Sequence, residues 1–498
     1  MLTRDEFQAL YDQGPDAVYA LFQTLWATIA LQQKRITALE EQNAHLLARV
    51  QELEARLSRD SHNSSKPPSS DGFNKPNPKP CNLRQKTDKH TGGQPGHPGH
   101  TLELVENPDH TLVHAPTTCA GCGGSLQDAH VLGKDRRQVF DLPPLKLEVT
   151  EHQALSCVCP HCNLLNVGAF PEEVAQPTQY GPQMLGLCVY LSQYQLLPLA
   201  RIQEMLVDLF GHSPSQGTFT SAIAACSRRL EPVETALKTA LLRAPVLHSD
   251  ETGVQVAKQL HWIHVAATPL LTLYAHHAKR GREAFTTMGI LPHFEGTSVH
   301  DSLASYHDRT YACTHSLCNA HLLRELLGLF ETNSQTWTQR MSALLRSLKR
   351  AKEAAELQGK PALDPTLLLR YQSLYRRIVA QGLAKNPAPT RTGQRGRPAN
   401  GVCRSLLLRL KEREDAVLRF ALDFAVPFDN NQAERDLRMI KVQQKVSGCF
   451  RSTEGADHFC RIRGYISTLR KQGSGVLSSL RSVFMGNPIY PCLEAPVQ

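Results

Sequence analysis

The sequence predicts a multidomain protein whose largest part is a mixed β-sheet with flanking helices. Three β-branched or aromatic runs, over 245–256, 260–267 and 271–276, are separated by short polar turns and predict a three-stranded meander. A helical pattern over 283–288 and a short strand over 297–300 follow, and that strand is expected beside the first one. Helical periodicity dominates on both sides of this region, and 498 residues leave room for about three domains.

Composition excludes several classes of protein. The chain carries 55 Lys and Arg against 46 Asp and Glu, a net charge of +9, and 41% of its residues are hydrophobic; an acidic disordered protein and a disulfide-stapled miniprotein are both excluded. No apolar run reaches the ~18 residues that a membrane-spanning helix needs, and the first residues lack a signal-peptide pattern. We therefore expect a cytoplasmic protein whose 14 cysteines stay reduced, so that clustered cysteines are candidate metal ligands.

The segment 15–60 predicts a coiled-coil helix resembling a leucine zipper. Its apolar residues recur at alternating spacings of three and four, which is the seam of a heptad repeat. The seam consists of Phe22, Leu25, Ile29, Ile36, Leu39, Leu46, Val50, Leu53 and Leu57. Asn43 falls at an a position, where a buried amide fixes the register of a parallel dimer. The alternative is one amphipathic helix packed on its own domain, but the length of the seam favours a homo-oligomer.

Residues 61–104 predict a flexible linker. Ser, Pro, Gly and Asn make up 21 of the 40 residues over 61–100, and few large apolar side chains are present. Pro67 and Pro68 prevent the preceding helix from continuing, because proline removes a backbone donor and restricts the residue before it.

The segment 105–175 predicts a small zinc-binding domain. It contains two Cys-x-x-Cys pairs with 36 residues between them. The four candidate ligands are Cys119, Cys122, Cys159 and Cys162. Two such pairs suit one structural Zn²⁺ in tetrahedral coordination, which leaves no open position for water. Cys157 is a rival ligand, and buried thiols without a metal are the alternative.

The segment 180–243 is predicted to be helical. A helix over 202–210, a Gly-His-Ser-Pro break and a helix over 218–230 form a helical hairpin, with Ser213 as candidate N-cap and Pro214 in the first turn. Such a hairpin is a candidate for reading DNA, although plain packing is the commoner role.

Two acidic residues of the sheet region are candidate metal ligands. Asp250 lies in the first strand and Asp301 directly follows the fourth, so the two meet if these strands pack side by side. Carboxylates brought together there repel each other unless divalent cations neutralise them. The helix predicted after residue 428 supplies candidates for a third carboxylate, among them Glu434. The plainer alternative is two ordinary strand-end aspartates and a surface ion pair between Glu434 and Arg438.

The segment 435–471 is predicted to contact a polyanion. It holds nine Lys or Arg and only three acidic residues, a balance typical of nucleic-acid binding. The candidate DNA-contacting residues are Arg435, Arg438, Lys441, Lys445 and Arg451.

Four sequence blocks together resemble one known family. The blocks are Asp250-Glu251-Thr252, Val299-His300-Asp301 with Tyr306, Cys318-Asn319-Ala320-His321 with Arg324, and Asp429-Asn430-Asn431-Gln432-Ala433-Glu434-Arg435 through 447–452. With the zipper-like helix, the Ser-Ser-Lys-Pro-Pro segment and the cysteine pairs, they make the chain similar to the DDE transposases of the bacterial insertion-sequence-66 family. The resemblance covers about residues 20–455.

The resemblance implies an RNase H-like catalytic core in which Asp250, Asp301 and Glu434 are the catalytic residues and hold two Mg²⁺ ions. Its implied parts are a first part of the core over 244–325, a helical insertion over 326–425, the catalytic Glu helix and basic segment over 426–471, and a C-terminal tail over 472–498. The tail has no counterpart that we can match.

The implied activity is Mg²⁺-dependent cleavage and strand transfer at the ends of an insertion sequence. Transposon ends and target DNA would be the partners, joined by accessory proteins of the same element, and the protein would be associated with the nucleoid. Two alternatives remain: a zinc-containing DNA-binding regulator with an inactive RNase H-like core, and an RNase H-like nuclease of DNA repair. The presence of all three acids disfavours the first, and the zipper and linker disfavour the second.

Overall fold

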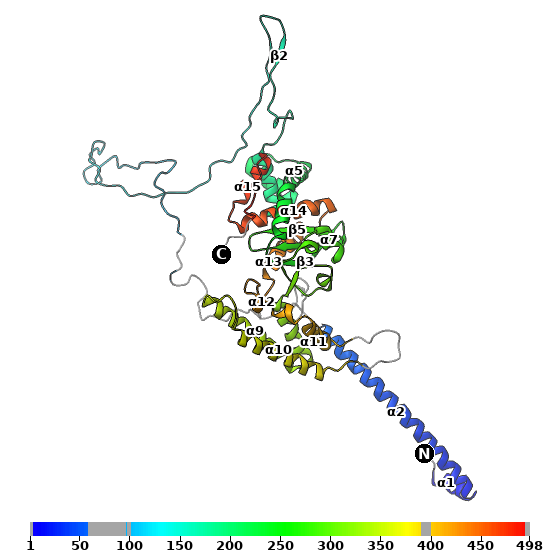
Figure 1. The fold of residues 1–498 in the computed structure, drawn as a ribbon. Helices are drawn as coiled ribbons and strands as arrows, with labels where there is room; N and C mark the ends of the chain where they lie inside the picture. Colours follow the sequence, from blue (N-terminus) through cyan, green and yellow to red (C-terminus); the bar gives the residue numbers. More distant parts are fainter. Residues whose placement is uncertain (1–2, 58–95, 97–100, 390–399, 494–498) are drawn as a thin grey trace.

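The computed structural model describes residues 3–57, 96, 101–389 and 400–493 (Figure 1). They form a mixed α/β molecule with one five-stranded sheet, one two-stranded sheet and many helices. Within the described residues, no helix combines the length and apolar character needed to cross a membrane. The linker predicted over 61–104 lies almost wholly outside the described residues.

The five-stranded sheet has the order β5-β4-β3-β6-β7. Its strands are β3 (Val246–Val256), β4 (Gln259–Ala267), β5 (Thr272–His277), β6 (Thr297–His300) and β7 (Thr314–Leu317). The first three form an antiparallel meander, β6 pairs in parallel with β3, and β7 pairs in parallel with β6. The predicted meander and fourth strand are confirmed. The strand β7 was not predicted from the sequence, because four residues are too few to show a clear alternation.

Helices cover both faces of this sheet. On one face, α13 (Asn431–Ser447) packs Leu437 and Ile440 into a cluster with Ile263 of β4. On the other face, α6 (Glu231–Leu242) and α7 (Arg282–Met288) join a second cluster that includes Leu273 of β5. Side chains alternate between the faces along each strand, which is why neighbouring strand residues belong to different clusters. The helix α14 (Thr453–Lys471) contacts β5 and contributes to both clusters.

The helical segment before the sheet forms as predicted, with one correction at a cap. Its other elements are α3 (Pro182–Val189), the π-helical η2 (Tyr190–Tyr194), α4 (Leu199–Phe210) and α5 (Gln216–Arg229). The N-cap of α5 is Ser215, whose hydroxyl accepts the backbone N–H of Thr218 at 3.2 Å. Ser213 was the wrong candidate, because its hydroxyl bonds to the carbonyl of Pro214, and that proline lies before the helix rather than in its first turn.

The helices between β7 and α13 enclose a core of their own. They are α8 (Asn319–Asn333), α9 (Thr336–Leu357), α10 (Pro365–Lys385), α11 (Val402–Glu412) and α12 (Glu414–Leu422). Trp337, Leu345, Leu407 and Phe420 are buried together in this core, so the helices predicted in this part of the chain pack as one unit beside the sheet (Figure 1). Two short 3₁₀ turns, η3 (Leu291–His293) and η4 (Ala304–His307), flank β6.

The C-terminal part of the chain takes part in the fold. The helix α15 (Val476–Phe484) packs against α3, and its Leu480 and Val483 are fully buried. Much of the segment expected as a tail over 472–498 therefore covers the core.

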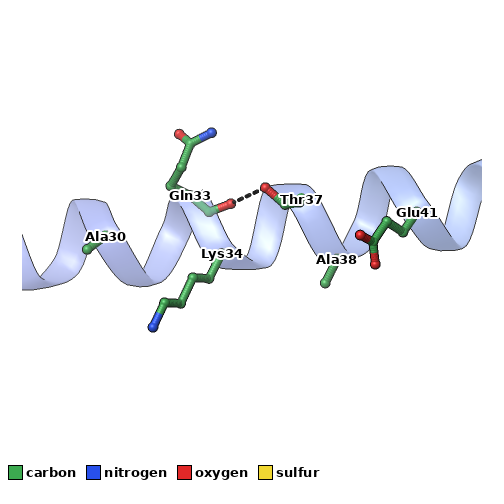
Figure 2. Close-up of a pocket in the computed structure, with 6 residues that line it drawn as sticks. All are labelled: Ala30, Gln33, Lys34, Thr37, Ala38 and Glu41. Atoms are coloured by element: carbon green, nitrogen blue, oxygen red, sulfur yellow. Dashed lines mark hydrogen bonds between the residues drawn. The ribbon is translucent and has the colours of Figure 1, made fainter.

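The N-terminal helix exposes the predicted seam from Phe22 to Leu53. After α1 (Arg4–Tyr11), α2 (Pro15–Leu57) runs as one long helix, and Leu39, Leu46 and Leu53 on it are 53%, 52% and 43% exposed. Figure 2 shows part of this helix, where a surface hollow is lined by side chains of α2 alone and the Thr37 hydroxyl donates to the Gln33 carbonyl. The hollow is thus an open helix surface.

Candidate metal centre

Strand pairing brings Asp250 and Asp301 together. In the parallel pair of β3 and β6, His248 lies opposite Val299, so two residues further along each strand Asp250 comes level with Asp301. Carboxylate oxygens of Asp250, Glu251 and Asp301 all lie within 4.8 Å of one another. The sequence-based expectation that these two aspartates are neighbours agrees with this register.

The carboxyl group of Asp250 has a strongly raised pKa. Burial raises its pKa well above the usual value, and the neighbouring charges of Glu251 and Asp301 raise it further. Its Oδ1 accepts one hydrogen bond, from the backbone N–H of Glu251 at 2.9 Å. A half-buried carboxylate among other carboxylates needs a proton or a cation, and this need marks a candidate functional site.

Glu251 differs from the two aspartates because both of its oxygens accept short hydrogen bonds from side chains, whereas Asp301 accepts one from the backbone N–H of Leu303 at 3.2 Å and lies 4.0 Å from Nη2 of Arg280. The Oε1 of Glu251 accepts from Arg280, with Nη2 at 2.7 Å and Nε at 2.9 Å, and its Oε2 accepts from the Tyr306 hydroxyl at 2.6 Å. Asp250 and Asp301 are therefore the freer ligands. Glu251 and Tyr306 belong to the family-like sequence blocks, but the role of Arg280 could not be predicted, because a charged residue in a loop after β5 gives no pattern of its own.

Asn430 fixes the start of α13 against β3. The side chain is fully buried, its Nδ2 donates to the Ser249 carbonyl at 2.8 Å, and its Oδ1 lies 2.9 Å from Nδ1 of His248. Its backbone N–H donates to Sγ of Cys318 at 3.2 Å. These contacts hold the first turn of α13, and with it Glu434, next to the strand that carries Asp250.

Glu434 is near enough to Asp250 and Asp301 for their charges to act on one another, but it does not join their group of potential ligands. Its Oε1 is 3.5 Å from Nδ1 of His321 and 3.6 Å from Nη2 of Arg324, and Cys318 completes a second group of potential ligands with His321. Burial raises the pKa of Glu434, and the charge of Asp301 contributes to that rise. Neither Glu434 Oε1 nor His321 Nδ1 has a hydrogen-bond partner, so this second group also has unused ligand capacity.

The predicted DNA-contacting residues divide into two kinds. Arg435, Arg438, Lys445 and Arg451 are exposed on or just after α13. Lys441 is half-buried, and its ammonium donates to the Gly253 carbonyl at 2.6 Å, so it holds α13 on β3 instead of facing solvent.

The predicted zinc ligands form two separate pairs in this structure. Strands β1 (Ser156–Val158) and β2 (Leu165–Val167) are antiparallel, and the turn between them carries Cys159 and Cys162, which interact with each other. Cys119 and Cys122 likewise interact with each other. Among the described residues, the two pairs do not meet in a common group of potential metal ligands.

Comparisons with known proteins agree with this organisation. The model of a family described as the transposase IS66 family matches residues 177–458. The zinc-finger binding domain of transposase IS66 matches residues 116–163, which include both cysteine pairs, and a family of unknown function matches residues 11–103. An uncharacterized protein of Sinorhizobium fredii, y4hP, is 22% identical over 390 residues, which is 73% of this chain and 69% of that protein.

The first of these matches covers more than half of the chain and includes Asp250, Asp301 and Glu434. Membership in this family implies DNA binding and a transposase-type, DNA-processing function, and the zinc-finger match indicates a zinc-binding region. The resemblance drawn from the sequence is confirmed, and the chain belongs to the transposase IS66 family.

Proposed function

We propose that the protein is a DDE transposase that catalyses metal-dependent cleavage and strand transfer at the ends of an insertion sequence. The observation that carries this proposal is the proximity of Asp250 on β3 and Asp301 directly after β6, with Glu434 on α13 near enough for its charge to act on Asp250. A meander followed by two parallel strands supports an RNase H-like core. The helices α8 to α12 would be its insertion, because they have a separate core.

The donor set fits hard divalent cations. Carboxylate oxygens are the ligands that Mg²⁺ prefers, and burial together with the charges of Glu251 and Asp301 raises the pKa of Asp250, which favours a bound cation. Asp250 and Asp301 would hold two Mg²⁺ ions from the sheet, and Glu434 would complete the site from α13. When bound, the ions would activate the attacking oxygen and stabilise the leaving 3′ oxygen.

The chain's own residues would bind and orient the DNA. The side chains of Asp301 and Glu434 are 25% and 32% exposed, so a phosphate can approach both. Arg435, Arg438, Lys445 and Arg451 would hold the backbone in register. Water would attack the phosphorus at the transposon end and expel the 3′ oxygen, which leaves as a hydroxyl. That hydroxyl would then attack a target phosphodiester in the same site.

The other segments would assemble the complex. The exposed seam of α2 would pair with a second copy of the chain, and one structural Zn²⁺ would join Cys119, Cys122, Cys159 and Cys162. Transposon ends and target DNA would be the partners, with accessory proteins of the same element, on the nucleoid in the cytoplasm.

The test removes one charge at a time from the triad. Asp250→Asn, Asp301→Asn and Glu434→Gln keep side-chain shape but weaken metal binding, and Glu454→Gln, at a glutamate that is 79% exposed, is the matched control. We would measure Mg²⁺-dependent cleavage of a duplex that carries the inverted repeats flanking the gene, and gel-shift affinity for the same duplex. Cleavage should fall about a hundredfold or more in the triad variants alone, while affinity should stay within about twofold.

Two outcomes would overturn the proposal. If the triad variants cut as well as the parent, these carboxylates do not form the catalytic site. If the parent binds the ends but never cuts them under any divalent metal, the protein is a DNA-binding regulator with an inactive core.

A further inference from the structure

A third group of potential metal ligands includes His300, the residue directly before Asp301. His300 ends β6, His307 ends η4 and His315 lies in β7, and one ring nitrogen from each lies within 4.8 Å of the others. We call His300, His307 and His315 the histidine cluster. In the parallel pair of β6 and β7, His315 is opposite Ser298, so His315 and His300 are diagonal neighbours on one face of the sheet. The 3₁₀ turn η4 brings the third ring to them.

The rings are close and their hydrogen bonding is incomplete. The ring centroids are 4.7, 5.0 and 5.3 Å apart, and Nε2 of His300 lies 3.1 Å from Nδ1 of His315. Nδ1 of the fully buried His300 and Nε2 of His307 are buried without any hydrogen-bond partner. Buried polar atoms are nearly always satisfied, so two orphaned imidazole nitrogens in one cluster indicate a missing ligand.

The chemistry of the cluster selects a different ion from that of the aspartates. Burial lowers the pKa of His307 to about 3 and also lowers the pKa of His315, and the nearby Arg413 adds to both shifts. These two rings are therefore neutral at physiological pH, which is the form that binds metals. Neutral imidazoles suit Zn²⁺ and similar transition metals, whereas Mg²⁺ prefers oxygen.

We propose that the histidine cluster binds one Zn²⁺-like transition-metal ion, distinct from the carboxylate site and from the cysteine pairs. Zinc bonds of about 2.0–2.1 Å to three imidazoles require ligand atoms roughly 3.3 Å apart, which small ring rotations reach from the present spacing. His307 and His315 are half-buried, so an ion can enter from the surface.

Such an ion would fix the loop that carries Asp301. It would tie β6, β7 and η4 together on both sides of Ser302, whose positive φ of 23° is an unfavourable backbone conformation for a residue with a side chain. Arg413 already donates to the Ser302 hydroxyl at 2.7 Å, and its charge will make zinc bind less tightly here than at four thiolates.

The test counts zinc in the full chain, purified in excess Mg²⁺ so that the carboxylate site is not available to zinc. We expect about two zinc ions per chain in the parent, and about one in His307→Ala, in His315→Ala and in Cys159→Ser. His293→Ala, at an exposed histidine on η3, should keep both ions. His307→Cys should also keep both, because a thiolate is a good zinc ligand.

Thermal unfolding with and without added Zn²⁺ gives a second readout that does not depend on cleavage. In a Cys159→Ser background, zinc should still raise the melting temperature, and the additional His307→Ala change should abolish that rise. A parent that holds a single zinc, lost entirely in Cys159→Ser, would overturn the proposal. Two zinc ions in His307→Ala would overturn it as well.

Discussion

Asn430 shows how one side chain positions the candidate site. Its amide donates to the Ser249 carbonyl and accepts from His248, so both halves of the amide are used across the gap between α13 and β3. Burial lowers the pKa of His248, which keeps that ring neutral with one N–H to donate. Only a group with a donor and an acceptor at this spacing satisfies both partners, which explains asparagine at this position.

We predict that Asn430→Ala lowers stability and cleavage together. The variant leaves the buried imidazole N–H of His248 without an acceptor and removes the bond that holds the start of α13 on β3. This loss should lower the free energy of unfolding by about 1–3 kcal/mol. Cleavage of the transposon-end duplex should fall more than gel-shift affinity, because Glu434 loses its position while the exposed arginines remain. Asn431→Ala, one residue away on the surface, should keep the melting temperature of the parent. Equal melting temperatures for the two variants would contradict this role of Asn430.

The count of basic residues over 435–471 overstates how many of them are free to contact DNA. Of the nine basic residues over 435–471, Arg463 is 2% exposed, Lys471 pairs with Asp436 at 2.8 Å, and Arg461 pairs with Glu234 at 2.7 Å. These side chains hold α14 and α13 in the fold. A count of charges cannot separate such residues from those that face solvent, because burial depends on the packing of distant segments.

At the scale of elements, α2 contacts α1 but keeps Leu39, Leu46 and Leu53 exposed. Exposing a row of leucines to water costs free energy. A second copy of the same helix would bury the heptad seam and recover that free energy. Neighbouring copies would then hold two catalytic cores near each other, as the joining of two transposon ends requires.

We predict that a peptide of residues 20–60 forms a dimer in sedimentation equilibrium. Replacing Leu46 and Leu53 by Glu should make it monomeric, because each buried leucine contributes about 1.5–3 kcal/mol of transfer free energy. Replacing Lys34 and Glu41, which lie outside the seam, by Gln is the control and should leave the dimer intact (Figure 2). A parent peptide that stays monomeric at high micromolar concentration would remove the basis for self-association through α2.

At the scale of the whole molecule, the charges at the carboxylate centre oppose folding unless a cation is bound. Burial raises the pKa values of Asp250, Glu251 and Glu434, so their ionisation costs the folded state more than the unfolded state. The stability that each of these groups contributes is complete below its unfolded pKa and is lost as the pH rises through its raised folded pKa. Metal-free protein should therefore lose stability above about pH 4 from these groups.

We predict that Asp250→Asn raises the melting temperature of the metal-free protein at neutral pH, and that this gain shrinks as the pH falls toward 4. Mg²⁺ at a hundred times its dissociation constant should stabilise the parent by about 2.7 kcal/mol and the variant much less. Asp308→Asn is the control of opposite sign, because hydrogen bonds from Thr310 lower the pKa of Asp308. The Asp308→Asn change should therefore reduce the stability of the protein at neutral pH. Scanning calorimetry of both variants, in chelator and in Mg²⁺, measures these melting temperatures. An unchanged or lower melting temperature for metal-free Asp250→Asn would contradict the prediction.

The local elements and the family could be predicted from the sequence. Alternation over 245–276 predicts the meander, the seam of α2 predicts a long helix, and the motif blocks indicate the transposase family. These features can be predicted because periodicity and short-range spacing depend only on residues that are close in the sequence.

Several contacts between distant parts of the chain could not be predicted from the sequence. The pairing of Glu251 with Arg280, the anchoring of Asn430 on β3 and the burial of Lys441 each join residues separated by 29 to 188 positions. The same holds for the orientation of Glu434 toward His321 and for the histidine cluster on three different elements. Register between β3, β6 and β7 and the docking of α13 set these distances, and such long-range pairings depend on the packing of the whole core rather than on any local run of residues.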